Sequence, residues 1–100
     1  MQLAPGTRLR SQVCETEVIV VKGGSLPADL TCGGHPMKSA GEAAGPVSDP
    51  EDGLDTGTLL GKRYGNGVVE VLVTRAGRGT IAVGREALPL QDARQLPSSD

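Results

Sequence analysis

The chain has 100 residues with a formal net charge of −2, and its hydrophobic side chains are almost wholly aliphatic, because it holds no Trp, no Phe and one tyrosine, Tyr64. This length allows one domain, 1–100, and the near absence of aromatic rings argues against a protein that stacks nucleic-acid bases. No apolar run could span a bilayer and no apolar segment follows a basic start, so we expect a cytoplasmic protein that binds neither membrane nor nucleic acid.

Fifteen glycines and seven prolines lie between short β-branched runs, a pattern typical of an all-β domain. The first unit, 1–37, contains the run 13–22, in which successive side chains alternate between the two faces of an extended strand. Two glycines end this run, and the chain can return over 26–32. We therefore predict a hairpin in the first unit.

The segment 38–57 holds five acids and one base, and its apolar residues are mostly alanine. Such a segment buries little surface, so we predict a flexible acidic loop. A solvated loop is the more common role for this composition, and a loop that contacts a partner is the alternative.

The second unit, 58–90, has a clearer strand pattern. Alternate valines of 68–74 face one way, and 80–83 can return after the glycine-containing turn 75–79, where we expect glycine to supply positive φ. We expect Tyr64 to cap the edge of the core. The second unit thus predicts another hairpin.

The two units repeat a pattern. The stretch 17–24 aligns with 70–77, and 30–34 aligns loosely with 81–85. A duplicated unit explains this likeness, although any two hairpins with glycine turns share part of it. We predict a small sandwich or open barrel of two β-hairpin units, followed by a frayed tail, 91–100.

A core of medium aliphatic side chains is thin for this length, so a metal, a disulfide or a second subunit is expected to add stability. Cys14 and Cys32 are the two cysteines, and His35 is the one histidine. Cys32 and His35 lie three residues apart across two glycines, a spacing that can direct two ligands at one ion. With Cys14 they would form a Cys₂His set, one ligand short of a tetrahedral site.

The sequence V-C-E-T-E-V-I-V-V followed by L-T-C-G-G-H-P-M resembles the desulforedoxin-type iron domain found at the N-terminus of desulfoferrodoxins. The resemblance covers 11–37. It matches Cys14 to the second cysteine of the family's opening pair and Cys32 to the first of its adjacent pair. Ser11 and Gly33 stand where the other two cysteines would be. The resemblance implies an iron module for electron transfer with half of its thiolates replaced, and a single histidine does not imply superoxide reduction.

Three interpretations of the cysteines stay open. Cys14 and Cys32 can be buried free thiols, which pack as small hydrophobic side chains. They can bind one zinc or iron ion that is completed by His35, by a carboxylate such as Glu15 or Asp29, or by a second subunit. They can also form a disulfide, which a reducing cytoplasm would disfavour.

The basic side chains of 58–90, five against two acids, form a patch that is either solvated charge or a contact for an acidic partner. A nucleophilic Cys32 assisted by His35 is the weaker alternative, since little chain is left to build a substrate pocket. We do not expect an enzyme. The sequence favours a non-catalytic accessory subunit or protein-interaction module, acting as a homo-oligomer or bound to a larger enzyme. The alternative is a desulforedoxin-like metal-binding module with an electron-transfer or structural role.

Overall fold

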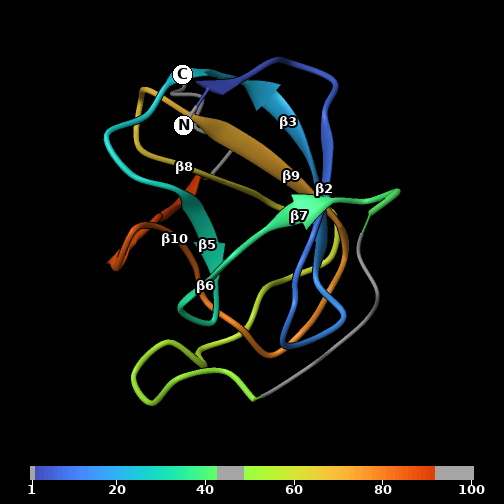
Figure 1. Ribbon diagram of the computed structural model, residues 1–100, viewed down its shortest axis with the longest axis vertical. Helices are drawn as coiled ribbons and strands as arrows, with labels where there is room; N and C mark the ends of the chain where they lie inside the picture. Colours follow the sequence, from blue (N-terminus) through green and yellow to red (C-terminus); the bar gives the residue numbers. More distant parts are fainter. Residues whose placement is uncertain (1, 43–48, 92–100) are drawn as a thin grey trace, which may run out of the picture.

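The computed structural model describes residues 2–42 and 49–91, and all regular structure in this part of the chain is β-strand (Figure 1). The strands are antiparallel and form sheets of six, four and two strands. The prediction of a small all-β sandwich is confirmed. Among the described residues, no helix is long and apolar enough to cross a membrane.

The six-stranded sheet has the order β12-β8-β9-β3-β2-β7. Its two longest strands, β3 and β9, lie at the centre and pair with each other (Figure 1). The strand bounds are β2 (Arg8–Arg10), β3 (Glu17–Lys22), β7 (Lys38–Ser39), β8 (Arg63–Gly65), β9 (Glu70–Arg75) and β12 (Leu90–Gln91).

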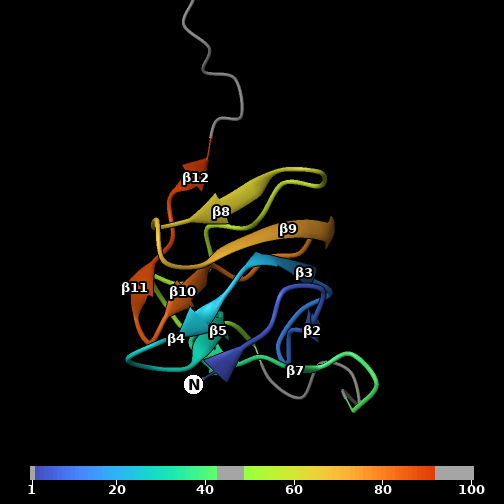
Figure 2. The same cartoon turned by 90° about the horizontal axis from the view of Figure 1, so that it is seen from above.

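The four-stranded sheet has the order β11-β10-β5-β6, and β1 pairs with β4 in a separate ribbon. Figure 2 shows β5, β10 and β11 as a group apart from the layer of β8, β9, β3 and β2. The remaining bounds are β1 (Gln2–Leu3), β4 (Gly24–Ser25), β5 (Leu30–Cys32), β6 (His35–Pro36), β10 (Ile81–Val83) and β11 (Glu86–Ala87).

The hydrophobic core lies between the six-stranded and the four-stranded sheet. In β3 and β9 every second side chain is buried, namely Val18, Val20, Val71 and Val73, because β-branched side chains suit a pleated surface that is covered on one face. The short strands β5 and β10 are buried along their whole length and supply the opposite wall. Tyr64 packs partly buried against this core, as expected.

The two units have the same strand order, related by an approximate two-fold axis. The six-stranded sheet reads β7-β2-β3 from one end and β12-β8-β9 from the other, and the four-stranded sheet reads β6-β5 and β11-β10. Ile19 pairs with Leu72 at the centre of one sheet, and Thr31 pairs with Ala82 at the centre of the other. The repeat predicted from the sequence is therefore present in the fold.

The predicted hairpin partners are wrong. Strand β3 pairs with β2 and β9, whereas β5 pairs with β6 and β10 in the other sheet. The second unit does the same, since β9 and β10 lie in different sheets. The connections that follow β3 and β9 cross to the other sheet. The apolar faces of successive strands therefore pack against each other across the core instead of pairing within one sheet.

The acidic segment 38–57 is not a free loop where it is described. Its first two residues form β7, the side chain of Leu54 is buried, and the amide of Glu51 donates to the carbonyl of Gly33 at 2.9 Å. Residues 43–48 lie outside the described part. The predicted tail begins within β12, at Gln91, and 92–100 also lie outside the described residues.

Candidate functional site

The two cysteines meet between the sheets. Cys14 lies in the connection from β2 to β3, Cys32 ends β5, and their Sγ atoms are 3.7 Å apart. Both thiols are free, with exposed fractions of 6% for Cys14 and 0% for Cys32. The structure thus brings the predicted pair together, although no hairpin pairs the segments that carry them.

A tight turn directs Cys14 toward the core. The hydroxyl oxygen of Ser11 accepts hydrogen bonds from the amides of Val13 at 3.0 Å and Cys14 at 3.2 Å, and the amide of Ser11 donates to the carbonyl of Thr16 at 2.9 Å. Serine is suited to this role, because its short side chain can bond to nearby backbone amides. Ser11, which the resemblance places at a cysteine position, lies with its Oγ 3.3 Å from the sulfur of Cys14.

The polar contacts of the pair decide which sulfur carries the proton. The sulfur of Cys14 contacts Cys32, lies 3.2 Å from the hydroxyl of Thr16 and accepts a hydrogen bond from the amide of Gly79 at 3.4 Å. The hydrogen bond from Cys32, helped by Ser11 and Thr16, outweighs burial and lowers the pKa of Cys14 to about 4. The same contact, together with burial, raises the pKa of Cys32. Of the two sulfurs, Cys14 is thus the one whose thiolate form these contacts favour.

The loop between β9 and β10, from the second unit, closes over these sulfurs. A Cβ atom added to Gly77 would lie 2.9 Å from the sulfur of Cys14, and one added to Gly79 would lie 2.7 Å from the sulfur of Cys32. Neither glycine adopts a positive φ. The expected reason for these glycines is thus wrong: they allow close approach of the backbone to the sulfurs.

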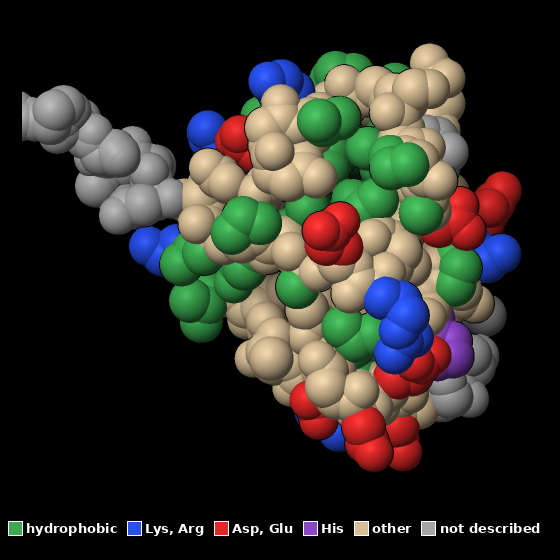
Figure 3. Space-filling view, turned by 90° about the vertical axis from the view of Figure 1, so that its left-hand side faces the viewer, with side chains coloured by type: hydrophobic (Ala, Val, Ile, Leu, Met, Phe, Trp, Pro, Cys, Tyr) green, Lys and Arg blue, Asp and Glu red, His purple; other side chains and the backbone are tan. Residues whose placement is uncertain are grey.

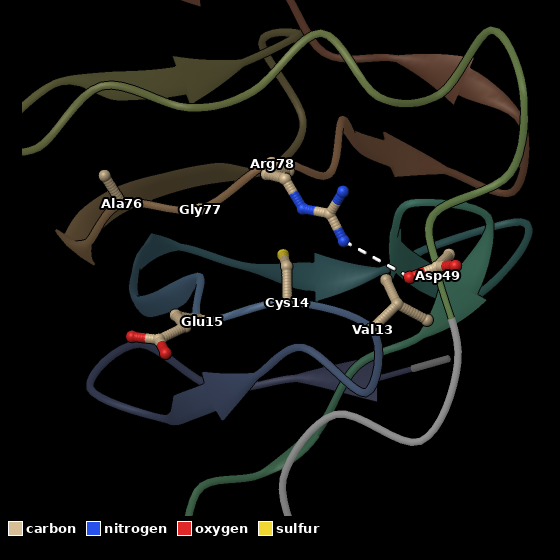
Figure 4. Close-up of a pocket in the computed structure, with 7 residues that line it drawn as sticks. All are labelled: Val13, Cys14, Glu15, Asp49, Ala76, Gly77 and Arg78. Carbon is tan, nitrogen blue, oxygen red and sulfur yellow. Dashed lines mark hydrogen bonds and ion pairs between the residues drawn. The ribbon is translucent and has the colours of Figure 1, made fainter.

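A pocket of about 450 Å³ opens beside Cys14. In Figure 4 the segment that carries Cys14 lies opposite the segment of Gly77 and Arg78, and the sulfur points into the space between them. Arg78 forms an exposed ion pair with Asp49 at 3.3 Å. The pocket is lined by Val13, Cys14, Glu15, Asp49, Ala76, Gly77 and Arg78.

The third predicted ligand, His35, has a different neighbour. Its Nε2 lies 4.0 Å from a carboxylate oxygen of Glu51, and Glu51 also accepts a 2.6 Å hydrogen bond from Arg85, which lowers the pKa of the carboxyl. In the described part of the chain, no group of three or more His, Cys, Asp or Glu side chains is arranged to hold a metal ion. The Cys14, Cys32 and His35 set stays a prediction.

The iron site implied by the resemblance does not fit the residues present. Two thiolates on one tetrahedral ion, with metal–sulfur bonds of about 2.3 Å, would be separated much as Cys14 and Cys32 are. The next nearest groups are hydroxyls, however, and Gly33 cannot carry a fourth ligand: a Cβ there would lie 2.6 Å from a methyl group of Val13. The described residues therefore supply two of the four thiolates of such an iron site, and the ligand set is incomplete.

The second unit shows what the fold requires at these positions. Val83 pairs with Leu30 as Cys32 pairs with Ile81, so Val83 is the counterpart of Cys32 across the two-fold axis. Both side chains are buried. The second unit thus fills the corresponding place with a buried aliphatic side chain and no sulfur.

The turns before β3 and β9 correspond as well. The side chain of Asn66 accepts hydrogen bonds from the amides of Val68 and Val69, as Ser11 does in the first unit. The second turn, 66–69, is two residues shorter than 11–16 and has no counterpart of Cys14. The buried Val69 takes the place of Thr16, so the polar site exists only in the first unit.

Sequence reasoning did not select Thr16, Gly77 or Gly79. The sequence signal for the two glycines is their pairing in 75–79, which resembles an ordinary turn, and Thr16 reads as one more residue of a strand-like run. Comparisons with protein-family models, curated proteins and solved structures give no match for this chain.

Proposed function

We propose that the protein is a small non-catalytic interaction module, acting as a self-associating chain or as an accessory subunit of a larger enzyme. The observation that carries the proposal is an apolar corner, formed by Leu59, Leu60, Tyr64 and Leu90. The leucines are 55%, 66% and 49% exposed, respectively. Removing such side chains from water on association is favourable.

A hydrogen bond and a strand pairing link Leu59, Tyr64 and Leu90. The hydroxyl of Tyr64 accepts a hydrogen bond from the amide of Leu59 at 3.1 Å, and Leu90 pairs directly with Tyr64 across the two strands. Strand β12 is at the edge of the six-stranded sheet, so its outer backbone groups have no strand partner among the described residues. A free edge beside apolar side chains favours association with another chain.

The charges around the apolar corner indicate the chemistry of a partner. Lys62 and Arg63 are exposed, and Arg63 is paired with Glu70 at 3.2 Å. The segment 58–90 carries more basic than acidic side chains. A partner surface with leucine-like side chains and an acidic rim is complementary to this corner. Apolar side chains with basic ones nearby are visible on the face shown in Figure 3.

Site-specific photo-crosslinking tests the proposal. A photoreactive residue is placed at Leu60 and, as a matched control, at Val21, which is 40% exposed on β3. We expect crosslinks from position 60 and few from position 21, and the mass of the product separates a second copy of the chain from a different protein. Equal crosslinking at both positions, with unchanged sedimentation of a Leu60→Asp variant, would contradict the proposal.

The metal-binding alternative rests on the sequence resemblance. Elemental analysis of protein purified without oxygen, beside the Cys14→Ser/Cys32→Ser double variant, tests it. Near-stoichiometric iron or zinc that is lost in the double variant supports a metal module, and equal trace metal in both proteins counts against it. Iron would also give a coloured thiolate band, whereas zinc is redox-silent.

A further inference from the structure

We propose that Cys14 and Cys32 form a reversible dithiol–disulfide pair, oxidised by exchange with a small-molecule disulfide that enters the pocket beside Cys14. The inference concerns a different surface from the apolar corner and does not depend on it. It rests on the distance between the sulfurs, on the unequal access to them, and on the valine at the counterpart of Cys32.

The two sulfurs lie close to each other. The sulfurs are 3.7 Å apart, and a disulfide needs them at about 2.05 Å. Cys14 lies in a turn rather than in a paired strand, so a local adjustment of 11–16 can bring its sulfur closer. The absence of side chains at Gly77 and Gly79 leaves the backbone of the covering loop in contact with both sulfurs.

Access to the two sulfurs is unequal. Cys14 lines the pocket, whereas Cys32 is fully buried and is not among the lining residues. An entering disulfide therefore meets Cys14 first, and Cys32 is placed behind it. This order gives Cys14 the role of the attacking thiol and Cys32 the role of the resolving thiol.

The reaction balances in two exchanges. The Cys14 thiolate attacks one sulfur of R–S–S–R, forms the mixed disulfide Cys14–S–S–R and releases R–S⁻, which takes up a proton. The thiol of Cys32 then loses its proton and attacks the sulfur of Cys14, which breaks the mixed disulfide and releases a second R–SH. Relative to the dithiol, the protein loses two protons and two electrons, and the small disulfide takes them up to become two thiols.

The second unit of the repeat has no sulfur or hydroxyl group at the corresponding places. The counterparts of Cys32 and Thr16 are the buried valines Val83 and Val69, so an apolar side chain satisfies the packing at both places. The first unit instead surrounds a sulfur pair with hydroxyl groups and a backbone amide. Such polar groups around the sulfurs favour a reactive role for the two cysteines over a role in core packing alone.

Oxidised glutathione is the probe for the test. The fully reduced full-length chain is incubated with it and analysed by intact mass and peptide mapping. We expect the wild type to lose two hydrogens and to yield a peptide pair joined through Cys14 and Cys32. In Cys32→Val, which copies Val83, the resolving step is absent, so a stable glutathione adduct should accumulate at Cys14.

The matched control is Cys14→Ser, in which we expect Cys32 to stay reduced because it does not line the pocket. Circular dichroism verifies that each variant is folded. Should Cys32→Val fail to fold, the wild-type disulfide and the unreactive Cys14→Ser protein still decide the question. The proposal is overturned when folded wild type keeps both thiols free in excess oxidised glutathione, or when the adduct forms at Cys32 instead of Cys14.

Discussion

At the scale of single residues, the chemistry of the site depends on the hydrogen bonds to one sulfur. Cys32, Ser11 and Thr16 all contact the sulfur of Cys14, and together they hold its pKa far below the ordinary thiol value of about 8.5. The charged side chains that line the pocket, Glu15, Asp49 and Arg78, are of mixed sign. The hydrogen bonds, more than these charges, therefore lower the pKa of Cys14.

The lowered pKa of Cys14 predicts how the alkylation of this residue depends on pH. A lowered pKa leaves the thiolate populated in acid, so the iodoacetamide reaction of Cys14 should persist well below pH 8. Cys32→Val removes the largest hydrogen-bond contribution and should move the midpoint upward, toward the ordinary value. Thr16→Val should move it in the same direction by less.

The control for this profile is Thr74→Val on β9. The hydroxyl of Thr74 donates to the carbonyl of Glu17 and is exposed, so the substitution changes a threonine away from the sulfurs. Its midpoint should equal that of the wild type. If the wild-type alkylation midpoint lies near that of free cysteine, the hydrogen bonds do not lower the pKa of Cys14.

At the scale of elements, the loop between β9 and β10 matters as much as the strands. It belongs to the second unit, yet it covers the cysteines of the first, and Gly77 and Thr58 are joined by a 3.1 Å hydrogen bond from amide to hydroxyl. Thr58 in turn lies 3.4 Å from the hydroxyl of Thr16. The site is thus built by both units although its sulfurs come from one.

Gly79→Ala tests this contact. The added methyl group would meet the sulfur of Cys32 at 2.7 Å, so overpacking should lower the free energy of unfolding by about 1–3 kcal/mol in urea unfolding. The matched substitution is Gly41→Ala, where an added Cβ has no neighbour within 4 Å. That change should stay within about 0.5 kcal/mol of the wild type. Equal effects of the two substitutions would mean that the loop is not packed against the sulfurs.

At the scale of the whole molecule, the cysteine pair joins the two layers. Cys14 follows β2 of the six-stranded sheet, and Cys32 belongs to the four-stranded sheet. A disulfide between them would link the layers covalently and close a loop of 19 residues. Oxidation would therefore act on the stability of the sandwich as a whole.

We expect the oxidised protein to be more stable than the reduced protein by about 3 kcal/mol, because the closed loop restricts the unfolded chain. Urea unfolding of the oxidised and the reduced forms measures this difference. The Cys32→Val variant, treated with the same oxidant, is the control and should show no such gain. A less stable oxidised form would indicate that closing the 3.7 Å gap strains the native structure.

The sequence was most informative where a property is local. Alternating β-branched runs and frequent glycine predicted an all-β protein, and the matching stretches at Glu17 and Glu70 predicted the repeat that the sheets display. The proximity of Cys14 and Cys32 was expected from a hairpin that does not form, and packing between the sheets brings them together instead. The inferences of fold class and repeat hold because side-chain alternation and turn residues act over a few neighbouring residues.

The pairing of the strands and the surroundings of the sulfurs were decided only by the tertiary structure. Strand β3 has apolar side chains that could serve several partners, and the choice of β9 over β5 depends on which faces close the core together. Gly79 reaches Cys14 across 65 positions of sequence, and Gly33 is closed to a ligand by Val13. Local patterns along the chain were sufficient for the fold class and the repeated units, whereas packing between distant segments sets which strands pair and what contacts the cysteines.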